Sequence, residues 1–236
     1  MKLPFKIKQV KPRIFLFEFT DQYDMGMHFL RYQEFYESPN TKFRNKSFTI
    51  LDFMEWYSKN HENKFTYCTD WGGYNFPSNI ISNCLENILD YNRYDLNMEL
   101  AYNQCIYKID KINRRANIDE KFYIIGAMKG NESTLKHETA HGYYYLNSSY
   151  KKETNKLVKA LPIKFRKNME TMLAKMGYTK QVFVDEIQAY YSTTDALETY
   201  LDYYGAIKLN KKDIAKLHDL QKPFIETFKK YNDTQI

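Results

Sequence analysis

Two histidines and a glutamate stand close together in the second half of this chain. His137 and His141 are four positions apart, and Glu138 directly follows the first of them. On an α-helix this spacing puts both imidazoles on one face about a turn apart, so that both can bind one Zn²⁺ at ~2.0–2.1 Å. Glu138 would flank such a metal and could accept a proton from a zinc-bound water. The pattern therefore predicts a zinc site with a general base.

The neighbouring residues favour the helix that this chemistry requires. Asn131 or Ser133 can cap the start of a helix, and no proline follows before Asn147. The preceding run Phe122–Met128 is apolar and rich in β-branched residues, which is typical of a strand. Because the chain has only five histidines, a chance occurrence of the motif is a weak alternative.

With this motif on a predicted strand and helix, the chain resembles the zincin superfamily of metallopeptidases. The resemblance covers residues 122–150 and one later helix. The metzincin branch would require Gly at 144 and His at 147, where this chain has Tyr144 and Asn147. The gluzincin branch takes its third ligand from a glutamate on a downstream helix. The resemblance thus implies Glu186 as the third protein ligand, water as the fourth, and peptide hydrolysis as the activity.

The spacing between the two parts of this motif is unusual. Between His141 and Glu186 lie 44 residues, more than in the best-known gluzincins. We interpret them as a helical pair over residues 150–161 and 162–176, with Gly177 as the stop. A helical hairpin returns the chain near its origin, so the spacing is compatible with one site. The resemblance also implies that the strand before the metal helix is an edge strand able to pair with an extended peptide.

Asp185 and Glu186 are adjacent, and only one of them can face the metal. If residues 182–204 form one helix, an apolar stripe runs along it through Phe183, Ile187, Tyr190, Thr194, Leu197 and Leu201. Glu186 lies about 50° from the centre of that stripe and Asp185 about 150°. We therefore expect Glu186 to bind the metal, and Asp185 at most to orient a histidine.

Other side chains could take part in the chemistry. Tyr190, one turn beyond Glu186, could stabilise the oxyanion of a tetrahedral intermediate, and Tyr144 invites the same interpretation. Core packing is the commoner role in a chain with 22 tyrosines, but Tyr190 is kept beside Glu138 as a candidate catalytic residue. His218 stands in a lysine-rich stretch and is interpreted as a surface histidine.

The fold class predicted is α+β. Residues 1–115 form a mixed N-terminal subdomain and residues 116–236 a helix-rich, zincin-like catalytic subdomain, with the cleft where they meet. A strand is expected over residues 13–19 and helices over 48–57, 80–88 and 96–109. Residues 70–78, rich in glycine and aromatics, predict a packed loop that either binds substrate or covers the core. A polar connection at 112–120 marks the boundary.

Composition limits the remaining possibilities. No stretch approaches the ~18 apolar residues of a membrane helix, and the start lacks the apolar segment of a signal peptide. Three widely spaced cysteines, Cys68, Cys84 and Cys105, suit reduced thiols, so we expect a cytoplasmic protein. The net charge is +6, but the basic segment 208–230 also contains acidic residues. An ordinary solvated helix explains it, which argues against nucleic-acid binding.

The sequence therefore predicts a zinc-dependent metallohydrolase, a peptidase acting on a peptide or protein substrate. The alternative is a zinc-stabilised interaction protein that cleaves nothing. A structural zinc site needs no proton acceptor at Glu138 and usually has a fourth protein ligand. No cysteine or third histidine stands near the motif, which argues against this alternative.

Overall fold

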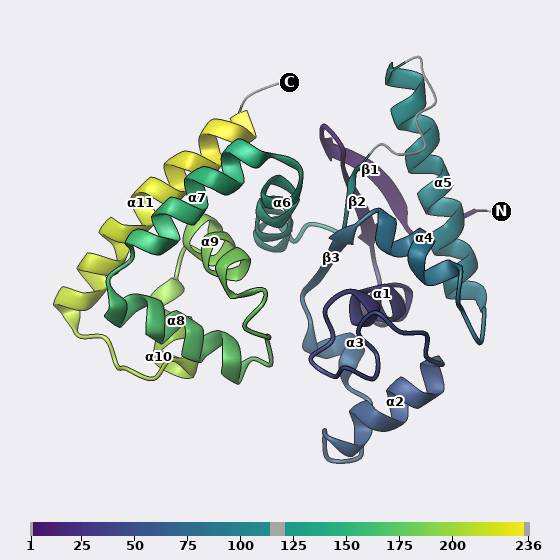
Figure 1. The fold of residues 1–236 in the computed structure, drawn as a ribbon, viewed down its shortest axis with the longest axis horizontal. Helices are drawn as coiled ribbons and strands as arrows, with labels where there is room; N and C mark the ends of the chain where they lie inside the picture. Colours follow the sequence, from purple (N-terminus) through teal and green to yellow (C-terminus); the bar gives the residue numbers. More distant parts are fainter. Residues whose placement is uncertain (1, 114–120, 234–236) are drawn as a thin grey trace. The chain divides into compact units, whose positions relative to one another are not determined.

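The computed structural model describes residues 2–113 and 121–233 and has the predicted α+β fold, with a mixed sheet followed by a helix-rich part (Figure 1). The chain divides into two compact units, Met1–Leu135 and Lys136–Ile236. The boundary and the polar connection predicted around residues 112–120 fall largely outside the described residues. The division lies later than predicted because strand β4 (Tyr123–Met128) is hydrogen-bonded within the sheet of the first unit.

The first unit contains all four strands of the sheet. In chain order its elements are β1 (Lys6–Lys11), β2 (Ile14–Phe19), α1 (Gln22–Glu37), α2 (Ile50–Lys59), α3 (Tyr67–Asp70), β3 (Gly73–Pro77), α4 (Asn79–Leu85), α5 (Arg93–Asn113) and β4. The strand order is β1-β2-β4-β3, with β2 and β4 parallel and the other two pairs antiparallel. The expected strand over 13–19 and the three expected helices are present with shifted ends, whereas β1, α1 and β3 were not anticipated.

Strand β4 is an inner strand, because it pairs with β2 on one side and with β3 on the other. All but its last residue are buried, as is typical of a strand covered on both faces. The expectation of a free edge here, available to an extended peptide, is therefore wrong. The physical reason is that part of the expected loop at 70–78 forms β3 and occupies that edge.

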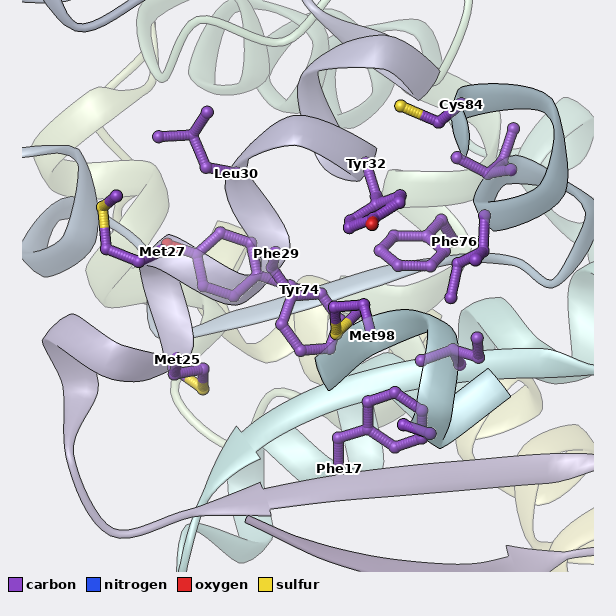
Figure 2. Close-up of a cluster of buried hydrophobic side chains, with 14 of the residues drawn as sticks. Phe17, Met25, Met27, Phe29, Leu30, Tyr32, Tyr74, Phe76, Cys84 and Met98 are labelled. Carbon is purple, nitrogen blue, oxygen red and sulfur yellow. The ribbon is translucent and has the colours of Figure 1, made fainter. Parts of the chain in front are cut away.

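Aromatic side chains from α1 and β3 form much of the core of the first unit (Figure 2). Phe29 of α1 stacks on Tyr74 with ring centroids 5.3 Å apart and lies 5.4 Å from Phe76. Burial of the alternate residues Tyr74 and Phe76 explains why this segment is a strand. For these aromatics, covering the core is the interpretation that holds. The three cysteines are buried and carry no disulfide.

The second unit is built from helices. They are α6 (Glu132–Leu146), which begins just before the boundary, α7 (Ser148–Ala160), α8 (Ile163–Lys175), α9 (Phe183–Thr193), α10 (Leu197–Tyr204) and α11 (Lys211–Asp233). Helices α7 and α8 are the expected pair, and Gly177 follows them with a positive φ of 93°. Apolar residues of α7 to α11 share one core. Among the described residues, no helix has both the length and the apolar composition needed to cross a membrane.

A break at Thr194 divides the single helix expected over residues 182–204 into α9 and α10. The backbone of Thr194 is extended, with φ −98° and ψ 114°. Its carbonyl accepts a hydrogen bond of 2.9 Å from the side-chain amide of Gln221, which lies on α11. A contact from a distant helix thus stabilises the break, and no glycine or proline marks it in the sequence.

Close packing at Gly126 in β4 generates a stability prediction. A Cβ at this position would lie 2.5 Å from Cε2 of Phe29, whose ring is held by its neighbours in the core. Gly126→Ala should therefore lower the free energy of unfolding by about 1–3 kcal/mol in chemical denaturation. Gly72→Ala is the control, because its nearest contact is an ordinary 3.7 Å to Oγ1 of Thr134. Equal stability of the two variants would contradict the packing described.

Candidate metal centre

Helix α6 carries His137 and His141 one turn apart, with their Nε2 atoms 3.3 Å from each other. The side chain of Asn131 accepts a hydrogen bond of 3.1 Å from the backbone N–H of Thr134, so Asn131 caps the start of the helix. The motif is therefore on a helix, as its chemistry requires. Both rings direct the same nitrogen toward one point.

Glu186, in the first turn of α9, brings a carboxylate to that point. Its Oε2 lies 3.6 Å from Nε2 of His137, and its Oε1 lies 3.6 Å from Nε2 of His141. The candidate ligand atoms of these three side chains all lie within 4.8 Å of one another. The structure thus brings together the three residues named as ligands from the sequence, close enough to hold one metal ion.

The separation between the two imidazole nitrogens suits two ligands of one zinc ion. Two ligands bound at ~2.0–2.1 Å from a zinc ion with tetrahedral angles lie about 3.3–3.4 Å apart. The distance between the two imidazole nitrogens is 3.3 Å, and each distance from nitrogen to carboxylate oxygen is 3.6 Å. The two carboxylate distances involve different oxygens of Glu186, so for all three residues to bind one ion a single oxygen would have to move toward one of the nitrogens.

Each histidine is held from behind by a hydrogen bond at its other nitrogen. Nδ1 of His141 lies 2.9 Å from Oδ1 of Asp185, a carboxylate that can only accept. Nδ1 of His137 lies 3.4 Å from Oγ1 of Thr193, and that hydroxyl already donates its hydrogen to the carbonyl of Ala189 at 2.7 Å. Both Nδ1 atoms therefore carry hydrogen, which leaves the Nε2 lone pairs directed at the shared point.

The carboxylate at this point has unused hydrogen-bonding capacity. Oε2 of Glu186 is buried and accepts no hydrogen bond from the described residues. A buried carboxylate oxygen without a donor is costly in free energy. A cation bound between this oxygen and the two Nε2 atoms would remove that cost, so the residues present fit a metal ion.

The charges around the centre shift the pKa values of its members in opposite directions. Burial disfavours the charged form of His141, but Asp185 and Glu186 outweigh it and raise the pKa of His141 well above its ordinary value. Burial likewise opposes ionisation of Glu186, yet the two histidines lower its pKa. Without a metal, the centre is therefore most stable as an ionised carboxylate beside a protonated imidazole.

Asp185 and Glu186 occupy different sides of the histidines. Asp185 is the nearer carboxylate to His141, but it contacts Nδ1, which points away from the shared site. Glu186 faces Nε2 of both His137 and His141. Glu186 thus remains the predicted ligand, and Asp185 has the orienting position that the sequence left open for it.

The two candidate catalytic residues lie close to this group. Glu138 is buried, and its charge acts on both His141 and Tyr190. The ring of Tyr190 packs edge-on against His137 with centroids 4.8 Å apart, and its hydroxyl is 3.9 Å from the sulfur of Met176. These contacts support a packing role for Tyr190. Stabilisation of an oxyanion by Tyr190 stays a prediction, as does the role of Glu138 as proton acceptor.

Two side chains weighed from the sequence have other partners. The hydroxyl of Tyr144 donates to Oδ1 of Asn155 at 2.9 Å. His218 is exposed, and its Nε2 lies 3.3 Å from Oε2 of Glu198. Both observations agree with the structural interpretations given above.

Thr193 is the member of this centre that the sequence analysis missed. It stands seven positions after Glu186, and a seven-residue spacing returns to the same face of a helix after two turns. That spacing was the available signal. It was overlooked because threonine is not a zinc ligand, although its hydroxyl can hold one in place.

Comparisons with known proteins identify no relative: no protein-family model, curated protein or solved structure matches this chain significantly.

Ligand substitutions test the assignment of the metal centre. Glu186→Ala and His141→Ala should each abolish tight zinc binding, because two remaining ligands compete poorly with water and buffer. The Asp185→Ala variant should still bind zinc, but with an affinity lowered by about 10–100-fold, since only the orientation of His141 is lost. Zinc affinity is measured by competition with a chelating dye. Glu198→Ala is the control, because it removes a carboxylate that pairs with a histidine away from this centre. Tight zinc binding by the Glu186→Ala variant would refute the assignment.

The raised pKa of His141 gives a pH prediction. In the folded, metal-free protein this imidazole keeps its proton above its ordinary pKa of about 6.5. The protonated imidazole therefore stabilises the folded, metal-free protein. This stabilisation is fully present below the ordinary pKa and is lost as the pH rises through the raised pKa of His141. Zinc requires the neutral imidazole, so binding at pH 7 should release close to one proton, and affinity should rise with pH. Calorimetry in two buffers of different ionisation enthalpy measures the number of protons released on zinc binding. A heat of binding that is the same in both buffers would contradict the prediction.

Proposed function

We propose that this protein is a zinc-dependent metallohydrolase, and specifically a peptidase. The observation that carries the proposal is the convergence of His137, His141 and Glu186 on one point, on a helix that also carries Glu138. Three protein ligands of the nitrogen and oxygen type are typical of catalytic zinc sites, which keep a fourth position for water. Structural zinc sites usually close with four protein ligands, whereas the metal-binding group in the described part of this chain has three members.

Each residue has a defined task in the proposed reaction. Bound Zn²⁺ would lower the pKa of a water molecule and polarise the carbonyl of the substrate. His137, His141 and Glu186 would hold the metal. Glu138 would accept the proton of the attacking water and later deliver it to the leaving amine. Tyr190 would contribute a hydroxyl to the developing oxyanion if it can turn from Met176.

The same residues support a place among the gluzincins. A glutamate on a helix after the histidine motif is the feature that separates this branch from the metzincins, and Glu186 on α9 has that position. The departure is the intervening pair α7 and α8, which lengthens the spacing to 44 residues. The substrate preference of known gluzincins is therefore not transferred to this chain.

Replacement of the proton acceptor tests the proposal. Glu138→Gln should keep the zinc and lower peptide turnover by about 10²–10⁴-fold, because the amide has the same shape but cannot accept a proton. Cleavage of a mixed peptide library by the zinc-loaded protein, read by mass spectrometry, gives the rates. Glu132→Gln, an exposed change at the start of the same helix, should leave them unchanged.

Two outcomes would overturn the proposal. Undiminished cleavage by the Glu138→Gln variant would exclude this mechanism. Tight zinc binding without cleavage by the wild type would favour the alternative, a zinc-stabilised interaction protein.

A further inference from the structure

Asp185, which orients His141, is itself held by a second hydrogen bond. Its Oδ1 accepts from Nε2 of Gln188 at 2.9 Å, one turn further along α9. Oε1 of Gln188 accepts in turn from the hydroxyl of Tyr150 at 2.8 Å. The contacts form a continuous series from Tyr150 on α7, through Gln188 and Asp185 on α9, to His141 on α6.

The direction of every hydrogen bond in this series follows from the chemistry of its members. The carboxylate of Asp185 only accepts, so the amide of Gln188 must present its NH₂ group to it. Its oxygen then faces Tyr150 and can only accept, so the phenol donates. Hydrogen on Nδ1 of His141 completes the series and leaves Nε2 free to bind a metal.

Tyr150 and Gln188 are shielded from solvent, whereas the carboxylate of Asp185, which lies between Gln188 and His141, is partly exposed. Tyr150 and Gln188 are completely buried, but the side chain of Asp185 is 26% exposed. Asp185 could therefore turn toward water and release His141. A hydrogen bond from a fully buried partner restricts this rotation, and the rigid phenol restricts the amide in turn.

We infer that Tyr150 and Gln188 are positioning residues of the metal centre, which act on His141 through Asp185. Helix α7 belongs to the segment that lengthens the spacing between the histidine motif and Glu186. On this inference the segment is more than a spacer, because it supplies the outermost support of one ligand. The inference rests on the metal centre of the proposed function and is independent of whether the protein cleaves peptides.

Two tyrosine-to-phenylalanine substitutions, each of which removes one buried hydroxyl, provide the test. Tyr150→Phe should weaken zinc binding by about threefold to tenfold, the range expected when one buried hydrogen bond is lost. Tyr191→Phe is the matched control, because its hydroxyl is equally buried but has no hydrogen-bond partner among the described residues. It should leave the affinity within about twofold of the wild type. Both affinities are measured at pH 7 by dye competition, with circular dichroism confirming the fold.

A double substitution separates positioning from a general effect on stability. If Tyr150 acts through Asp185, then Tyr150→Phe added to Asp185→Ala should cause no further loss of affinity. Gln188→Met, which keeps the length but removes both hydrogen bonds, should weaken zinc binding at least as much as Tyr150→Phe and replaces it if that variant does not fold. The absorption spectrum of the Co²⁺-substituted protein should change in the Tyr150 and Gln188 variants but not in Tyr191→Phe.

The outcomes distinguish the inference from the function it rests on. Unchanged zinc affinity in both Tyr150→Phe and Gln188→Met, with tight binding by the wild type, would overturn the inference alone. An equal loss in the presence and absence of Asp185 would also overturn it, because the effect would not pass through that carboxylate. Absence of zinc binding by the wild type would overturn both the inference and the proposed function.

Discussion

Two imidazole lone pairs and a buried carboxylate meet within a few ångströms in the second unit, and this concentration of negative potential requires a positive charge. Nε2 of His137 and Nε2 of His141 are 3.3 Å apart, with Glu186 beside them. In the absence of metal, a proton on His141 supplies the charge, which is why its pKa is raised. A divalent cation would supply it better. Either cation would join the histidines of α6 to Glu186 of α9.

The core of the candidate centre was predictable because its spacing is local. His137 and His141 share a helical face by arithmetic alone. The resemblance to gluzincins implied a downstream glutamate as third ligand, and the apolar stripe favoured Glu186 over Asp185. The break at Thr194 removes the later half of that stripe from the helix, but Phe183, Ile187 and Tyr190 lie before it and still place Glu186 nearer the buried face than Asp185. Support by Gln188 and Tyr150 could not be predicted, since it depends on how α7 packs against α9. No sequence spacing encodes that contact.

The first unit was predicted less well for a similar reason. Residues Gly73–Pro77 have the composition of a turn, yet burial of Tyr74 and Phe76 against Phe29 makes them a strand. Tertiary packing thus overrides the local preference of glycine. Because β3 pairs with β4, β4 is an inner strand and not the expected edge strand. Interpreting residues 73–77 as a loop therefore also gave the wrong position for β4 in the sheet.

The parallel pairing of β2 with β4 has a consequence for the order in which the chain can assemble. Ile14 pairs with Tyr123, so more than 100 residues separate the two strands. Closing so long a loop is entropically unfavourable until the helices between them have formed, and such non-local pairing slows folding. During synthesis the β1–β2 hairpin therefore lacks its neighbour β4 until β4 leaves the ribosome, whereas α1, which packs on β2, is made long before.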